Sequence, residues 1–168
     1  MERILIKDLA TRIGETVNIQ GIVSVRRDQG KMVFFDIRDR SGTIQGVALP
    51  KSGAIDIAKE VTIESAVEMT GIVNARPEKN VVADKVNGNI ELQIEGIIVL
   101  NAAETLPFDL SSELHLDTHL DHLPLMLHTE RSRDVFTIQA EILQSYRDSL
   151  RAQGFTEFVA PALVGGDA

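Results

Sequence analysis

Hydrophobic and polar residues alternate over much of the first hundred positions, with the period of two that is typical of half-buried strands. Five segments follow this pattern and are predicted as strands: residues 17–25, Met32–Arg38, Thr43–Leu49, Ala66–Asn74 and Ile90–Leu100. A short helix is predicted over Ala54–Lys59, after the sheet-breaking residues Pro50 and Gly53. Five strands of this length favour a small barrel over a sandwich.

The pattern changes after Asn101. An acidic segment without a clear period follows, and then apolar residues recur at helical spacing: Val135, Ile138, Ile142, Leu143, Tyr146 and Leu150. Ser132 is predicted to cap this helix and Gly154 to end it, with a strand-like piece over Glu157–Leu163. Because a closed barrel fills its own core, we expect the apolar stripe of the helix to need another partner.

The alternation within Met32–Arg38 puts Phe34, Asp36 and Arg38 on one face and Val33, Phe35 and Ile37 on the other. The second face is a core face. The first carries an aromatic ring among charged residues, and bases of single-stranded nucleic acid stack on such rings while phosphates meet guanidinium groups. The alternative is that Phe34 is one more buried strand aromatic, and periodicity alone leaves both interpretations open.

The net charge of −8 argues against a nucleic-acid-binding protein, but its distribution matters. Residues 1–60 carry ten Lys and Arg against eight Asp and Glu, whereas residues 61–168 carry seven against seventeen. The acidic excess therefore lies away from the candidate binding face. A weakly basic face can still attract a polyanion, and we expect its affinity to be modest.

Composition excludes several other classes. Cysteine is absent, which removes disulfides and thiolate metal sites, and the longest apolar runs, such as Ile97–Leu100, are too short to span a bilayer. The N-terminus does not resemble a signal peptide, so a cytoplasmic protein without membrane association is expected. Four histidines, His115, His119, His122 and His128, could ligate zinc by spacing, but we predict no metal site because no cysteine supports one.

Several segments together resemble a known family in their order and spacing. They are Gly21–Val23, Arg27–Gly30, Phe34, Ile37–Asp39, Ile44–Gln45, Thr70–Asn80, Gly88–Leu92 and Leu106–Asp109. This arrangement resembles the anticodon-binding domain of aspartyl-tRNA synthetases, which is a five-stranded OB-fold. The later stretch Gly154–Pro161 resembles motif 1 of class II aminoacyl-tRNA synthetases.

The resemblance assigns roles to individual residues. Phe34 would stack on the central anticodon base, Gln45 and Glu91 would bind base edges, and Arg27 would meet a base or a phosphate. Four loop or turn residues would make weaker backbone contacts: Arg26, Arg76, Lys79 and Asn80. Pro161 would lie at a class II dimer interface. Each of these side chains could instead be an ordinary surface residue of the barrel, its turns or its loops.

The fold class is therefore predicted as mainly β, a five-stranded OB-fold barrel followed by a linker and an amphipathic helix. The expected domains are an anticodon-binding domain over 1–103, an acidic hinge over 104–131, and the truncated start of a catalytic domain over 132–168. The resemblance implies that a full-length aspartate–tRNA ligase would use ATP and Mg²⁺ and act as a homodimer. This fragment alone would bind tRNA, hold no catalytic residues and need no cofactor.

Three alternatives remain from the sequence. The chain could be the corresponding domain of an asparaginyl- or lysyl-tRNA synthetase, since these share the fold and the central base. It could be a general single-stranded nucleic-acid-binding OB module, although such a module needs no additional amphipathic helix. It could also be an interaction protein that dimerises through that helix.

Overall fold

The computed structural model describes residues 2–110, 112 and 114–161, and it divides into two units between Pro107 and Phe108. This division falls inside the segment 104–131 that the sequence predicts as a linker. The first unit contains two 3-10 helices, five strands and one short α-helix: η1 (Ile6–Thr11), β1 (Thr16–Asp28), β2 (Val33–Asp39), β3 (Gly42–Ala48), α1 (Ile55–Glu60), β4 (Ala66–Ala75), η2 (Glu78–Asn80) and β5 (Ile90–Asn101).

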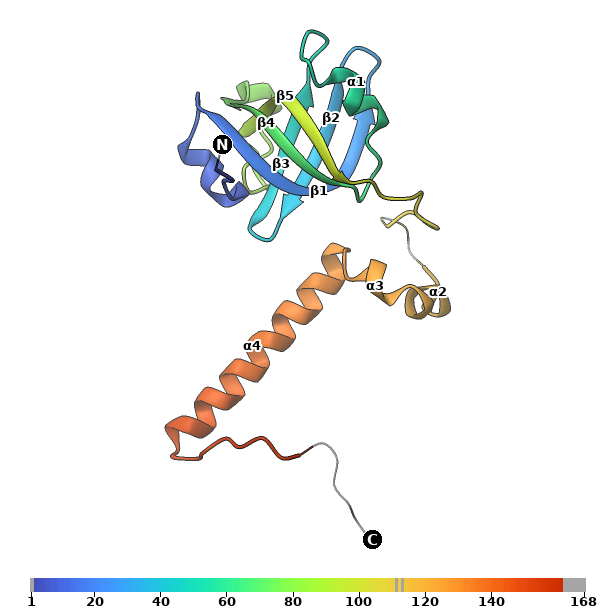
Figure 1. Cartoon of the computed structure of the whole chain (residues 1–168). Helices are drawn as coiled ribbons and strands as arrows, with labels where there is room; N and C mark the ends of the chain where they lie inside the picture. The colour runs from blue at the N-terminus through green and yellow to red at the C-terminus, as the bar shows by residue number, and fades with distance from the viewer. Residues whose placement is uncertain (1, 111, 113, 162–168) are drawn as a thin grey trace. The chain divides into compact units, whose positions relative to one another are not determined.

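The five strands close into a barrel in the order β1-β2-β3-β5-β4 (Figure 1). Neighbouring strands are antiparallel except β3 and β5, which pair in parallel with Gly46 opposite Leu92. The predicted five-stranded OB-fold barrel is confirmed, and each strand lies within a few residues of its predicted position. Its interior is filled by inward-facing apolar side chains, of which Phe35 is the largest that is fully buried.

A β-bulge in β1 changes which of its side chains face outward. The pairing with β2 shifts between Val23, which lies opposite Ile37, and Val25, which lies opposite Asp36. Ser24 is the extra residue of this bulge, so each residue after it faces the side opposite to the one that an uninterrupted alternation would give. Strict alternation over the predicted strand 17–25 would put Val25 on the same face as Val23, and this is wrong: Val23 is buried, whereas Val25 faces outward and is half-buried.

The predicted short helix is confirmed as α1, displaced by one residue. Ala54 and Ala58 belong to the barrel core, and the guanidinium of Arg26 donates to the carbonyl oxygens of Lys59 and Val61 at the C-terminal end of the helix. The last carbonyls of a helix have no intrahelical partner, so Arg26 supplies one. This arrangement links β1 to α1 on the core side of the sheet.

The turn between β2 and β3 is built around the Asp39 carboxylate. Its Oδ1 accepts from the Ser41 amide at 2.7 Å, the Ser41 hydroxyl at 2.6 Å and the Gly42 amide at 3.1 Å, while Oδ2 accepts from the Ile6 amide at 3.0 Å. Burial raises the pKa of Asp39, but these hydrogen bonds outweigh burial and hold the pKa below its usual 3.8. One side chain thus fixes both the turn and the start of η1.

The second unit contains three α-helices: α2 (Leu116–Asp121), α3 (Leu123–Met126) and α4 (Glu130–Ala152). Two of them lie in the acidic segment where no periodic structure is predicted. Helix α4 is capped by Thr129, whose hydroxyl accepts from the Ser132 amide at 3.3 Å, so the prediction of Ser132 as the cap is wrong. None of the helices in the described part of the chain is both long and apolar enough to span a bilayer.

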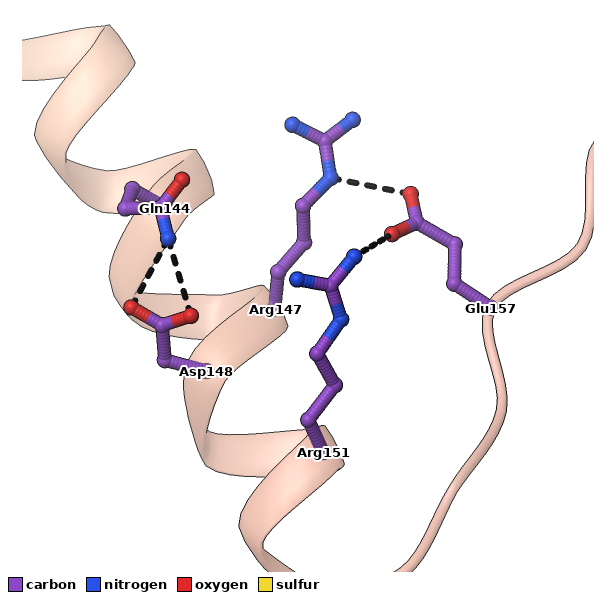
Figure 2. Close-up of polar contacts among 5 residues, drawn as sticks. All are labelled: Gln144, Arg147, Asp148, Arg151 and Glu157. Atoms are coloured by element: carbon purple, nitrogen blue, oxygen red, sulfur yellow. Dashed lines mark hydrogen bonds and ion pairs between the residues drawn. The ribbon is translucent and has the colours of Figure 1, made fainter.

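The predicted end of α4 at Gly154 is confirmed. Gly154 has a φ of +88°, and the Phe155 amide donates to the Leu150 carbonyl at 3.1 Å, which is a Schellman arrangement. After this turn, Glu157 accepts from Arg147 Nε at 2.9 Å and from Arg151 Nη2 at 3.0 Å, as Figure 2 shows. The strand-like piece predicted from Glu157 is wrong over 157–161, and residues 162–163 lie outside the described residues.

Candidate nucleic-acid interface

Two neighbouring rows of outward-facing residues cross the sheet formed by β1, β2, β3 and β5. In the first row, Arg27 lies opposite Phe34, Phe34 opposite Val47, and Val47 opposite Gln93. In the second row, Val25 lies opposite Asp36 and Asp36 opposite Gln45, while Glu91 comes one residue before the Gly46–Leu92 pair. The register therefore brings the four main predicted residues, which are distant in sequence, onto one surface: Arg27, Phe34, Gln45 and Glu91.

Phe34 and Phe35 occupy the predicted faces of β2. Phe35 has no exposed surface and lies in the core, whereas Phe34 faces outward and stays partly exposed. This confirms the predicted alternation of β2. An aromatic ring that a sheet presents to solvent is available as a platform for stacking a base.

Arg27 extends over the outer face toward β2. Its Nη2 lies 3.2 Å from Asp36 Oδ1, and about half of the Arg27 side chain, 47%, remains exposed. A guanidinium has five donor hydrogens, so this single ion pair leaves others for an incoming phosphate or base. Asp36, which the sequence does not single out as a binding residue, is the group that orients Arg27 here.

Glu91 is held from the loop side by Arg76. Arg76 Nε lies 3.7 Å from Glu91 Oε2, and Arg76 Nη1 donates to the carbonyls of Asn80 and Gly88 at 3.5 and 3.4 Å. The Arg76 side chain is only 7% exposed, so in this structure it supports Glu91 and the β4–β5 loop more than it offers a surface for RNA. The Glu91 side chain is 26% exposed and is within reach of a ligand.

The loop that Arg76 supports is also fixed from its other end. Asn87 is buried with a φ of +61°, and its Nδ2 donates to the carbonyls of Ile6 and Thr43 at 3.2 and 3.3 Å. Asparagine tolerates this left-handed conformation better than most residues. The two ends of the β4–β5 loop therefore return to η1, β3 and β5, next to the candidate interface.

The remaining predicted residues do not join this surface to the same degree. Arg26 faces the opposite side of β1 from Arg27, with its guanidinium at the end of α1. Lys79 and Asn80 are exposed on η2, and Pro161 is exposed in the second unit. Their predicted contacts with RNA or with a second subunit stay predictions.

Two outward residues of β4 and β5 belong to the surface but are absent from the sequence prediction. Asn74 lies opposite Glu91, and its Nδ2 donates to Gln93 Oε1 at 3.2 Å. The alternation of Ile90–Leu100 places Gln93 on the same face as Glu91, which is a signal for its orientation. Its position in the row of Phe34 depends on the parallel pairing of β3 with β5, which no local pattern reveals.

The charges of this surface are balanced in pairs. Arg27 faces Asp36, and Arg76 faces Glu91. General attraction of a polyanion is therefore weak, and a ligand must gain affinity from stacking and from hydrogen bonds to base edges. Among the described residues, no group of three or more His, Asp or Glu side chains could hold a metal ion.

Comparison with known proteins identifies the family. A family model described as an OB-fold nucleic acid binding domain, named for the tRNA anticodon, matches residues 17–100, which is half of the chain. The chain belongs to this anticodon-type OB-fold family. The match covers strands β1 to β5, and it therefore contains every residue of the two outward rows.

Curated relatives extend the similarity of this OB domain into the second unit. The chain is 35% identical over 155 residues to an aspartate–tRNA(Asp/Asn) ligase of Corynebacterium aurimucosum, covering 89% of this chain and 25% of that protein. It is 33% identical over 165 residues to an asparagine–tRNA ligase of Desulforamulus reducens, covering 97% and 37%. The chain thus spans between about a quarter and two fifths of these relatives.

Solved structures agree with this fold. A protein of Leishmania major assigned as an aspartyl-tRNA synthetase matches with a TM-score of 0.85 and 27% identity, covering 98% of this chain and 35% of that one. The asparaginyl-tRNA synthetase of Pyrococcus horikoshii matches with a TM-score of 0.83 at 24% identity, covering 99% and 38%, which shows the fold alone.

Proposed function

We propose that this OB domain recognises the anticodon of a tRNA as part of an aspartate–tRNA ligase. The observation that carries this proposal is the exposed ring of Phe34, with Arg27 opposite it on β1 and with Gln45 and Glu91 in the next row. The outer face of strands 2 and 3 is where OB-folds bind oligonucleotides. The aspartate–tRNA ligases among the curated relatives support the choice of substrate.

Each residue of the surface has a separate role in this proposal. Phe34 stacks on the central base of a splayed anticodon loop, and such stacking contributes about 1–3 kcal/mol per base. The Gln45 amide offers both a donor and an acceptor to a base edge, and it has no hydrogen-bonding partner among the described residues. Glu91 accepts from base amino or imino groups, while Arg27 donates to a base or phosphate.

The activity of the longer protein is part of the same proposal. An aspartate–tRNA ligase attaches aspartate to tRNA with ATP and Mg²⁺, and both would be bound by a catalytic part beyond the OB domain. The residues of this chain would contribute only the selection and positioning of the tRNA. We further propose that the protein works in the cytoplasm as a homodimer, with the apolar stripe of α4 and Pro161 near the dimer contact.

Specificity for asparagine tRNA is the second candidate. It is favoured by the asparagine–tRNA ligase relative from Desulforamulus reducens and by relatives named as ligases for both tRNAs. The anticodons for aspartate and asparagine share their first and central bases and differ at the third, so stacking of the central base on Phe34 would serve either. A general single-stranded nucleic-acid module is less favoured, because the similarity to these ligases extends through α4.

A binding titration tests the proposal. The 168-residue chain is titrated against fluorescent stem-loops with the aspartate anticodon, with the asparagine anticodon, and with the central uridine replaced. The aspartate loop is expected to bind more tightly than the loop with the replaced base. Equal binding of these two loops would exclude sequence-specific recognition. Equal binding of the aspartate and asparagine loops, with discrimination at the central base, would favour dual specificity.

A further inference from the structure

Gln93 lies in the row of Phe34, two strands away across the candidate interface. Val47 separates the two residues, and it is only 5% exposed, so its neighbours largely cover it. Neighbouring strands lie about 4.8 Å apart, which places β5 about 10 Å from β2. A nucleotide that follows or precedes the base stacked on Phe34 would therefore lie over Val47 and Gln93.

The Gln93 amide pairs with the side-chain amide of Asn74. Asn74 Nδ2 donates to Gln93 Oε1 at 3.2 Å, and this oxygen is the only acceptor of the Gln93 side chain. The Nε2 amino group has no hydrogen-bonding partner among the described residues, and the side chain is partly exposed. In this arrangement Gln93 Nε2 presents two N–H donors, whereas a free glutamine can turn either end outward.

We propose that Gln93 is a further base-binding residue, whose amino group donates to the carbonyl edge of the base adjacent to the one stacked on Phe34. This inference rests on the proposed function and deepens it. Gln93 complements Glu91, which presents only acceptors from the same strand and so selects amino or imino groups. Asn74 is the positioning residue of Gln93, since it decides which end of the amide faces the RNA.

The first arm of the test removes the donors. Gln93→Leu is titrated against the aspartate stem-loop and against three loops in which one anticodon base at a time is replaced by an abasic nucleotide. Affinity for the parent loop is expected to fall about 5- to 10-fold, the worth of one good hydrogen bond. The loss is expected to shrink below about twofold on one abasic loop, the loop that lacks the partner base.

Gln20→Leu is the matched control. Gln20 also lies on the outer face of the barrel, but it is on the part of β1 that pairs with β4 and donates to Glu68 at 2.6 Å. Its replacement is expected to change RNA binding by less than about twofold. A Gln93→Leu protein that binds the parent loop like the wild type, while the wild type still discriminates at the central base, would overturn the inference.

The second arm reverses the amide. In Asn74→Asp the carboxylate can only accept, so Gln93 is expected to turn its amino group toward residue 74 and its oxygen toward the RNA. The preference at the contacted position should then shift from a carbonyl-bearing base toward an amino-bearing base, by about 5-fold or more in the ratio of affinities. The introduced carboxylate lowers the affinity for both loops alike, so its general electrostatic effect cancels in the ratio of the two affinities.

The two arms separate failure of the inference from failure of the proposed function. If the wild type binds all anticodon loops equally, the proposed function itself is wrong. If the wild type discriminates but the ratio in Asn74→Asp equals that of the wild type, only the role of Gln93 is wrong. Loss of the reversed preference in the double variant Asn74→Asp, Gln93→Leu would confirm that the amide carries it.

Discussion

Arg26 and Arg27 are adjacent in β1 but bind on opposite sides of the sheet. Arg26 lies opposite Phe35 and donates to carbonyls at the end of α1, whereas Arg27 lies opposite Phe34 and pairs with Asp36 at 3.2 Å. Adjacent strand residues always face opposite sides, and the bulge at Ser24 decides which arginine faces outward, because it inserts one residue and inverts the alternation that follows. The first arginine therefore serves the fold and the second faces the candidate interface.

Substitution of the two arginines by methionine should separate these roles. Arg26→Met is expected to lower the free energy of unfolding by about 1–2 kcal/mol, because carbonyls at the end of α1 lose a charged donor. Arg27→Met is expected to leave stability nearly unchanged, since its exposed ion pair contributes about 0–1 kcal/mol, and to weaken RNA binding. Urea unfolding and stem-loop titration measure the two effects, and the opposite assignment would mean that the bulge is misplaced.

The two phenylalanines of β2 allow a similar comparison. Phe35→Ala removes a fully buried ring and is expected to cost about 3–5 kcal/mol of stability. Phe34→Ala is expected to leave the melting temperature nearly unchanged and to weaken binding of the anticodon loop by about 1–3 kcal/mol. A Phe34→Ala protein that melts early but binds RNA normally would contradict the stacking role.

The strands and the outward position of Phe34 follow from alternation and turn chemistry that the sequence contains. Three features could not be predicted in this way. The bulge at Ser24 has no local signal, so the faces of Val25 and Arg27 required the structure. The parallel pairing of β3 with β5 joins segments that are nearly fifty residues apart, and it alone places Gln93 beside Val47. The Thr129 cap competes with Ser132, which has equally suitable chemistry.

Asp36 limits the electrostatic attraction of the interface. Asp36→Asn should free the Arg27 guanidinium and remove one negative charge beside the expected phosphate path. Stem-loop affinity is expected to rise about 2- to 5-fold at low salt, with the gain disappearing as salt screens the exposed charges. Asp56→Asn makes the same change of charge on an exposed position of α1 and should produce a smaller gain. Equal gains in both variants would indicate a net-charge effect alone.

Asp39 makes the stability of the barrel depend on pH. Its folded pKa lies below 3.8, the value expected in the unfolded chain, because four hydrogen bonds favour the carboxylate. Such a group stabilises the fold fully above pH 3.8, and this contribution is lost as the pH falls through the folded pKa. Asp39→Asn is expected to be less stable than the wild type at pH 7 by about 1–3 kcal/mol.

The difference in the free energy of unfolding between the wild type and Asp39→Asn should narrow below pH 3.8, where the wild-type carboxylate becomes protonated. Urea midpoints measured between pH 7 and pH 2.5 would show this convergence. A difference that stays constant over that range would mean that the Asp39 carboxylate does not carry the effect of its hydrogen bonds, and that the substitution acts through packing instead.

The apolar stripe of α4 is exposed in the part of the chain that the structure describes. Five of its six residues are between 46 and 63% exposed: Val135, Ile138, Ile142, Leu143 and Tyr146. Phe136, next to the stripe, is 50% exposed. A contiguous exposed apolar surface of this kind marks an interaction site, so we expect the chain to self-associate as its concentration rises. Sedimentation over a hundredfold range of concentration measures this.

Two substitutions on α4 test the role of the stripe directly. Ile142→Glu places a charge in the middle of the stripe and is expected to abolish self-association, whereas Thr137→Glu places the same charge on the opposite face of the helix and should leave it intact. Because both positions are exposed, neither change should disturb the barrel, and the melting temperature serves as the control. A wild-type chain that stays monomeric at high concentration, with strong amide-exchange protection throughout residues 132–153, would contradict this prediction. In that case the stripe must be covered within one chain, since an isolated and uncovered helix of this length exchanges its amide hydrogens readily.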